Sequence, residues 1–232
     1  MNRLAIARPE SFEEAGAILR ERRYSLPVIK AGGMDVVDHL KEGLIEPDAL
    51  IDVLPLHAWE GDRIVFEGGR LRLDPNTTLA EIASSALVQE HCPALAHAAD
   101  SAATPQVRNV ATIAGNLLQR PRCWYYRNET FDCLKKGGHQ CFAVDGENAY
   151  HAIFGDGPCY IVHPSNVAPV LDVCRGDVHV VGGRDPRTIA ARDLYHLPAD
   201  GLRSEHNLGK TEVVRSIELD AAPRSGFHSI KH

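Results

Sequence analysis

Two glycine-containing turns are the segments of this sequence that could bring backbone N–H groups against a bound anion. Residues 31–35 read AGGMD and follow a short apolar strand expected at 27–31, and residues 112–116 read TIAGN. Glycine lets the backbone approach a bulky or anionic group closely. Neither turn has the G-x-G-x-x-G spacing of a Rossmann site or the spacing of a P-loop. Each turn taken alone is therefore typical of an ordinary chain reversal.

Clustered cysteines are the second feature with chemical potential. Four of the six cysteines fall within 37 residues, and they are Cys123, Cys133, Cys141 and Cys159. They are separated by 9, 7 and 17 residues, so no C-x₂-C pair indicates a metal by spacing alone. Unrelated thiols are the default interpretation of such spacing, zinc ligands come next, and disulfides are disfavoured in a reducing compartment. Cys92 and Cys174 lie outside the cluster and are expected to be small buried side chains.

The clustered cysteines lie in a segment, 119–159, where aromatic residues and glycines are mixed without a period of 2 or 3.6. A stretch this long without regular structure is usually a functional or a disordered loop, and its aromatic content argues against disorder. His139, His151 and His163 have no ligand spacing, and no Ser/His/Asp or Cys/His arrangement indicates a nucleophile. Joint ligation by the cysteines would give this loop a reason to be ordered.

Short strands and helices alternate around these features. Capping boxes at 11–14 and 78–81 predict helix starts, and a Gly-Gly pair predicts a hairpin between strands at 63–67 and 70–73. Further strands are expected at 27–31, 49–53, 159–162 and 178–181, and further helices at 93–99 and 164–171. This alternation favours an α/β or α+β fold class.

Length and charge exclude several classes of protein. A chain of 232 residues suggests one large domain, or one domain and part of a second. With 25 Lys and Arg against 31 Asp and Glu, the net charge of −6 is spread along the chain, which disfavours nucleic-acid binding. An apolar content of 44% suits an ordinary globular core, and no apolar run is long enough to span a bilayer. The N-terminus lacks the apolar stretch of a secretory signal, so a cytoplasmic location is expected.

The two glycine turns, in this order and separation, resemble those of the FAD-binding middle subunits of molybdenum hydroxylases, the xanthine dehydrogenase and carbon monoxide dehydrogenase family. In that family an AGG-type loop and a T-x-GGN-type loop clamp the flavin diphosphate between two small subdomains. The resemblance covers residues 9–231 and is closest over 103–122 and 142–170. It implies an α/β (α+β) chain with the two-subdomain FAD-binding fold of the vanillyl-alcohol oxidase or PCMH type.

The resemblance also implies a division of the chain. The first FAD-binding subdomain would span 1–55, and the second would span 56–182 and contain the cysteine-rich insert at 119–159. Residues 183–232 would form a linker and an incomplete C-terminal α/β domain, whose opening strands are expected at 212–217 and 226–231.

Cofactor contacts are carried over from the resemblance residue by residue. The first loop would contribute Ile29, Lys30, Ala31, Gly32, Gly33, Met34, Asp35 and Val36. The second would contribute Thr112, Ile113, Ala114, Gly115 and Asn116, with Ala114 standing where the family usually has glycine. Four residues elsewhere would complete the site, namely Ala102, Asn166, Val214 and Lys231. Asn166 replaces the usual aspartate and keeps an acceptor without its charge.

Some members of the family, similar to 4-hydroxybenzoyl-CoA reductase and to the FAD subunit of periplasmic aldehyde oxidoreductase, carry a [4Fe–4S] cluster in such an insert. Residues 120–127, RPRCWYYR, resemble theirs. Four thiolates are the usual ligands of this cluster. The resemblance therefore implies Cys123, Cys133, Cys141 and Cys159 as its ligands.

The function implied is that of a flavin-carrying electron-transfer subunit, an oxidoreductase component with no catalytic side chain of its own. Its implied partners are a molybdopterin-binding large subunit, a small subunit with [2Fe–2S] centres and an external electron acceptor. A stand-alone flavin oxidase of the vanillyl-alcohol oxidase type is the first alternative, although no substrate-binding domain is visible in the sequence. A zinc-binding interaction module is the second.

Overall fold

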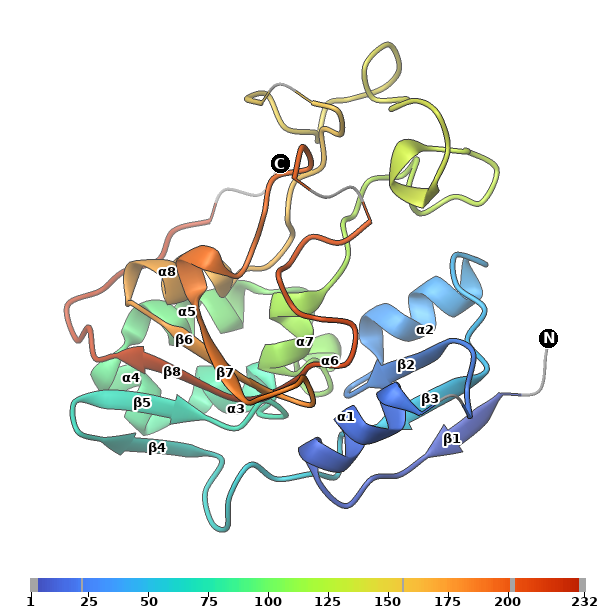
Figure 1. Ribbon diagram of the computed structural model, residues 1–232. Helices are drawn as coiled ribbons and strands as arrows, with labels where there is room; N and C mark the ends of the chain where they lie inside the picture. The colour runs from blue at the N-terminus through green and yellow to red at the C-terminus, as the bar shows by residue number, and fades with distance from the viewer. Residues whose placement is uncertain (1–3, 22, 156, 201–202, 230–232) are drawn as a thin grey trace.

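The N-terminal lobe is a small parallel sheet with its helices. A computed structural model describes residues 4–21, 23–155, 157–200 and 203–229 (Figure 1). Three strands pair in the order β1 (Ala5–Ala7), β3 (Ala49–Asp52) and β2 (Pro27–Lys30), all parallel. Two helices, α1 (Phe12–Arg20) and α2 (Met34–Lys41), connect them. The strands expected at 27–31 and 49–53 are thus confirmed.

Helix α1 begins where the sequence predicts. The Ser11 hydroxyl accepts a hydrogen bond from the Glu14 backbone N–H at 3.0 Å, which is an N-cap. The predicted reciprocal bond is not formed, because the Glu14 carboxylate accepts from the Glu10 N–H instead. Phe12 and Ala15 are buried and bring the helix against the sheet.

The second lobe is a five-stranded antiparallel sheet covered by helices. The strand order is β4 (Ile64–Glu67), β5 (Arg70–Leu73), β8 (Val213–Asp220), β6 (Asp177–Val181) and β7 (Arg187–Ala190). The helices are α3 (Leu79–Ser84), α4 (Ala86–His91), α5 (Pro93–Ser101), α6 (Pro105–Arg108), α7 (Ile113–Leu118) and α8 (Ala168–Val173). The predicted hairpin of β4 and β5 is confirmed, and so is the capping box of Thr78 and Glu81 at the start of α3.

Strand β8 corrects one expectation. Residues 212–217 were expected to open a further C-terminal domain, but β8 lies between β5 and β6 and pairs with both. It is thus an interior strand of the second lobe. Two smaller expectations are also wrong: residues 159–162 form no strand, and the helix expected at 164–171 begins only at Ala168.

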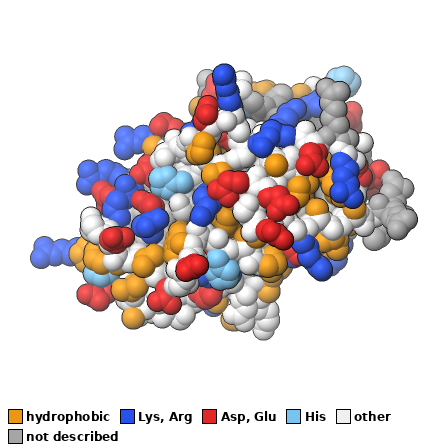
Figure 2. Space-filling view, turned by 60° about the horizontal axis from the view of Figure 1, so that its bottom comes forward, with side chains coloured by type: hydrophobic (Ala, Val, Ile, Leu, Met, Phe, Trp, Pro, Cys, Tyr) orange, Lys and Arg blue, Asp and Glu red, His pale blue; other side chains and the backbone are white. Residues whose placement is uncertain are grey.

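Hydrophobic packing joins the two lobes. One apolar cluster contains Phe12, Ile51 and Val53 of the first lobe together with Val181 and Val213 of the second. A Cβ at Gly16 in α1 would lie 2.3 Å from the Cα of Gly182, so helix and turn are in direct contact. Acidic and basic side chains are interspersed over the face drawn in Figure 2, as the dispersed charge of the sequence predicts.

The cysteine-rich insert leaves the second lobe after α7 and forms a separate projection (Figure 1). Its only regular element among the described residues is a 3₁₀ turn, η1 (Leu134–Lys136). Aromatic rings pack at its centre, with the Tyr125 and Phe131 centroids 5.0 Å apart and the Phe131 and Phe142 centroids 5.2 Å apart. The predicted absence of hydrophobic periodicity is therefore matched by a loop that folds on its own aromatic residues.

Candidate functional site

A cavity of about 810 Å³ lies where the two lobes and the base of the insert meet. Pockets that hold ligands and cofactors are commonly about 300–1,000 Å³ in volume. The predicted cofactor residues that line it are Ile29, Ala31, Gly32, Gly33, Met34, Asp35, Val36, Ala102, Thr112, Ala114, Gly115, Asn116, Asn166 and Val214. Both glycine turns therefore face one cavity, although about 80 residues separate them in the sequence.

The first turn joins β2 to α2. Gly33 has φ +79° and is the N-cap of α2, a left-handed conformation that side chains with a Cβ rarely adopt. Gly32 is needed for a different reason, because a Cβ there would lie 2.0 Å from the Val110 carbonyl oxygen. The first loop of one lobe thus contacts the approach to the second loop of the other.

The second turn begins α7. The Thr112 hydroxyl oxygen accepts from the Gly115 backbone N–H at 3.1 Å and keeps its own hydrogen to donate. Gly115 is exposed, and a Cβ there would meet only the Thr112 Oγ1, at 3.0 Å. This glycine therefore leaves room at the cavity wall for a ligand to approach the backbone.

A hydrogen bond orients Asn116 at the same wall. Its Oδ1 accepts from the Ser165 hydroxyl at 2.7 Å, and both side chains are buried. The amide nitrogen is therefore left as the donor that Asn116 can offer. Nothing in the sequence pairs these two residues, which stand 49 positions apart.

Two of the predicted residues are not among those that line the cavity. Lys30 pairs through Nζ with Asp52 Oδ1 at 3.0 Å, and Ile113 is fully buried in the core of the second lobe. Lys231 lies outside the described residues.

Four side chains that the sequence did not predict for the site, three of them charged, line the end of the cavity near the insert. Asp38, Arg120, Arg122 and Tyr126 contribute to this wall. Asp35, one of the predicted cofactor contacts, lies at the same end, and its Oδ1 accepts from Arg127 Nη2 at 2.7 Å. The run at 120–127 was the available signal, since it places three arginines directly after α7.

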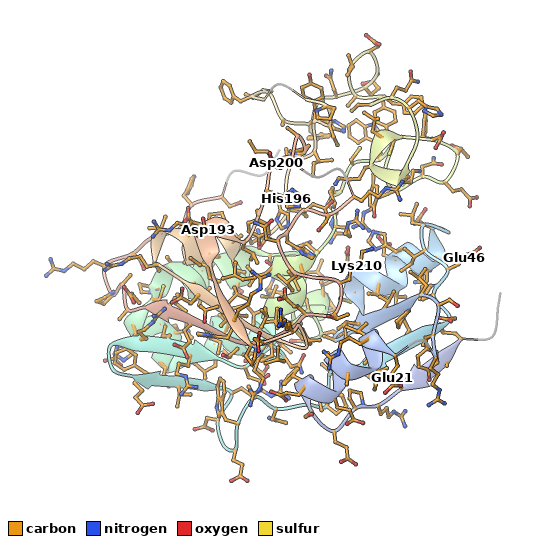
Figure 3. The ribbon with its side chains drawn as sticks, viewed as in Figure 1. Glu21, Glu46, Asp193, His196, Asp200 and Lys210 are labelled. Atoms are coloured by element: carbon orange, nitrogen blue, oxygen red, sulfur yellow. The ribbon has the colours of Figure 1, made fainter. Side chains whose placement is uncertain are left out.

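A buried ion pair ties the insert to the segment that follows β7. Figure 3 labels Asp193, His196 and Asp200 on this segment, which runs beneath the insert before it returns past Lys210. Lys135 of the insert pairs with Glu205 of the segment, and both side chains are at most 4% exposed. The Glu205 carboxylate also lies 2.7 Å from Arg120 Nε.

The four clustered cysteines share one neighbourhood. Burial raises the pKa of the Cys123 thiol, and the nearby Cys133 and Cys141 thiols raise it further. Burial raises the pKa of Cys159 to about 11, against the lowering effect of the Lys135 ammonium, and Cys141 and Cys123 again act on it. Within the described ranges, no three His, Cys, Asp or Glu side chains converge closely enough to hold a metal ion. The predicted ligands are thus neighbours without forming a closed ligand set.

The remaining cysteines are buried, as expected, and they also adjoin each other. The Sγ atoms of Cys92 and Cys174 lie 3.8 Å apart at the junction of α4, α5 and α8. Burial and the neighbouring Cys92 thiol raise the pKa of Cys174 to about 12.

Two α/β lobes that close on a cavity with a glycine loop from each lobe define the class of two-lobed FAD-binding flavoproteins. The chain belongs to the family described as the FAD binding domain in molybdopterin dehydrogenase, whose model matches residues 2–220. This confirms the α/β fold of the PCMH type and the family resemblance noted in the sequence. The match ends at the last residue of β8.

Known relatives agree with this assignment. The chain is 32% identical over 218 residues to the aldehyde oxidoreductase FAD-binding subunit PaoB of Escherichia coli K12. This alignment covers 92% of this chain and 67% of PaoB. It is 29% identical over 149 residues to the carbon monoxide dehydrogenase medium chain of Hydrogenophaga pseudoflava, covering 64% of this chain and 49% of that one. These relatives are subunits of oxidoreductases.

Solved structures share the fold. A structure of carbon monoxide dehydrogenase from Hydrogenophaga pseudoflava matches with a TM-score of 0.67 at 23% identity, covering 95% of this chain and 60% of that chain. The chain thus spans less than two thirds of the solved subunit that it matches. In the described parts of the chain, no helix is both long and apolar enough to cross a membrane.

Proposed function

We propose that this chain binds FAD in the cavity between its lobes and serves as the flavin-carrying electron-transfer component of a molybdenum hydroxylase. The observation that carries the proposal is the convergence of residues 31–35 and 112–116 on one cavity of about 810 Å³. Backbone N–H groups at the start of α2, together with Thr112 and Asn116, would bind the diphosphate. Val214, 4% exposed on β8, would pack against the ring system.

The chain's own residues bind and orient, whereas the redox chemistry belongs to the cofactor. Bound FAD supplies the ability to take up and release electrons singly or in pairs. Thr112 and Asn116 have their acceptor atoms already engaged within the protein, so each offers a donor to an anionic ligand. No side chain of the site is required as a nucleophile or a general base.

Partners follow from the same proposal. Electrons would arrive from a molybdopterin-binding large subunit through a small subunit with [2Fe–2S] centres and leave to an external acceptor. The names of the relatives support this, because they are FAD subunits or medium chains of oxidoreductases.

The cysteine group is proposed to hold a [4Fe–4S] cluster. Cys123, Cys133, Cys141 and Cys159 would be its ligands, and thiolates are the usual donors for it. The proximity of Cys133 and Cys141 to Cys123, and of Cys141 and Cys123 to Cys159, supports the proposal. Ligation would require the four sulfur atoms to lie closer together than they do in the described residues.

Flavin titration of the purified chain tests the principal proposal. The wild-type chain, freed of flavin, is expected to quench FAD fluorescence with one site per chain. Gly115→Val is expected to weaken FAD binding at least about 100-fold, because its side chain would occupy the space where the diphosphate approaches the backbone. Gly115→Ala should be intermediate.

A matched control separates this loss from a general effect of valine. Gly226 has no heavy atom within 4 Å of a Cβ position, and Gly226→Val should bind FAD like the wild type. Unchanged FAD affinity in Gly115→Val would contradict the two-loop site, and so would a wild-type chain that binds no flavin.

A further inference from the structure

We propose that Arg122, at the base of the insert, is a further dinucleotide-binding residue whose guanidinium pairs with the diphosphate of the flavin. This inference rests on the proposed function and adds to it a contact that comes from neither glycine loop. Arg122 lines the cavity beside the first turn of α2.

Arg122 is weakly engaged by the protein itself. Its Nη2 donates to Gln119 Oε1 at 2.9 Å. The nearest carboxylate oxygens lie at the longest distances at which an ion pair is recognised: Asp35 Oδ1 is 3.9 Å from Nη2 and Asp38 Oδ2 is 4.0 Å from Nη1. Its side chain is 55% exposed.

The same carboxylates accept closer hydrogen bonds from another arginine. Arg127, with a side chain 11% exposed, donates from Nη2 to Asp35 Oδ1 at 2.7 Å and from Nη1 to Asp38 Oδ2. The second oxygen of Asp35 accepts from the Arg120 backbone N–H at 2.8 Å. Asp35 and Asp38 therefore have close hydrogen-bond donors other than Arg122.

The ion pairs at this wall fall into two groups. Arg122 and Arg127 face Asp35 and Asp38, and Arg120 and Lys135 face Glu205. Within the first group, Arg127 holds both carboxylates at close range and Arg122 lies farther from them. Burial lowers the pKa of the adjoining His39, so this ring adds no positive charge at neutral pH.

A diphosphate fits the loosely paired guanidinium of Arg122. A guanidinium presents parallel N–H groups that match two phosphate oxygens, and such charge-assisted pairs are among the stronger hydrogen bonds. The neighbouring first turn of α2 offers backbone N–H groups and the positive end of the helix dipole. Arg122 would approach the anion from the base of the insert.

Three flavins of different charge test the assignment. FAD, FMN and riboflavin are titrated against the flavin-free wild type and Arg122→Ala by fluorescence quenching. The variant is expected to bind FAD about 10- to 100-fold more weakly, to lose less affinity for FMN and to bind riboflavin as the wild type does. Its FAD affinity should also depend less on salt concentration.

Two further variants keep the test decisive if Arg122→Ala folds poorly. Arg122→Lys should restore part of the affinity, since it keeps the charge and loses the planar fork. Arg72→Ala removes an arginine that pairs with Glu218 at 2.8 Å on the sheet, outside the cavity lining, and should leave flavin binding unchanged. Thermal unfolding of each flavin-free variant checks the fold.

The outcomes separate the two proposals. If the wild type binds no flavin, the proposed function fails and the inference fails with it. If the wild type binds FAD and Arg122→Ala binds it equally well with the same salt dependence, only the inference is overturned. An equal loss for riboflavin and FAD would also overturn it, because that result would make Arg122 a packing residue.

Discussion

Gly32 and Gly115 occupy the two loops for different physical reasons. At Gly32 the missing Cβ admits the Val110 carbonyl of the other lobe, whereas at Gly115 it leaves open space at the cavity wall. The sequence suggested a single reason for both, namely the approach of a diphosphate to the backbone. In the structure, Gly32 is also required for the close contact between the two lobes.

Single cysteines allow the proposed cluster to be tested. Cys133→Ser, at a side chain 6% exposed, is expected to remove most of about four irons per chain, because one of four thiolate ligands is lost. Iron and sulfide content after anaerobic purification is the measurement. Cys174→Ser is the control, and it should keep its iron while losing on the order of 1 kcal/mol of stability. Full iron in Cys133→Ser, or zinc in place of iron in the wild type, would remove the cluster from the proposal.

Helix α2 connects the two candidate centres. Its first turn carries the glycine loop, and the carboxylates of Asp35 and Asp38 on the same helix bind Arg127 of the insert. Arg127 Nε also donates to the Pro121 carbonyl at 2.8 Å, which closes the base of the insert on itself. The same helix therefore positions the diphosphate loop and the cysteine-bearing segment.

Removal of this arginine should loosen the insert while the lobes stay folded. In Arg127→Ala, Asp35 and Asp38 lose their close partner, at a cost of about 1–3 kcal/mol. Faster amide hydrogen exchange is expected across residues 120–163, with little change in the strands of either lobe. Arg127→Lys should be intermediate. Arg175→Ala, which removes an exposed pair with Asp220, is the control; equal exchange in all three variants would show that the contact does not hold the insert.

Local signals allowed some elements to be predicted from the sequence. The hairpin at 63–73 and the capping box of Thr78 are formed by residues that are close in the sequence, so the local sequence pattern predicts them. The place of β8 depends on pairing with strands far away in the chain, and residues 159–162 look strand-like but have no partner among the described strands. The glycine loops followed from the resemblance. Arg122 did not, because it reaches the cavity only where the base of the insert packs against α2.

At the scale of the whole molecule, partly buried histidines make stability depend on pH, because partial burial favours the uncharged ring. Burial lowers the pKa of His163 to about 4, and its ring packs against Tyr195 with centroids 4.3 Å apart. Burial also lowers the pKa of His206, which lies in the segment beneath the insert. In the unfolded chain these rings would titrate near 6.5.

Acidification should therefore destabilise the fold. Between pH 6.5 and about 4 the unfolded chain binds a proton at residue 163 that the folded chain does not, so the free energy of unfolding falls as pH falls. Below about pH 4 this contribution levels off. Denaturant unfolding at pH 7, 5.5 and 4 measures it, with His163→Gln as the comparison. The variant should show a shallower loss over this range, and an unchanged pH dependence would contradict the role of this ring.

The hydrogen bond of Ser165 to Asn116 has a consequence for how such a chain can change over generations. It joins two residues 49 positions apart, one just before the insert and one just after it. The two ends of the insert therefore lie next to each other in the fold. Lengthening or shortening a loop whose ends are already held together changes the entropic cost of loop closure only slightly. The cysteine-bearing insert could therefore be gained or lost as one segment during evolution, without any change in the sequence of either glycine loop.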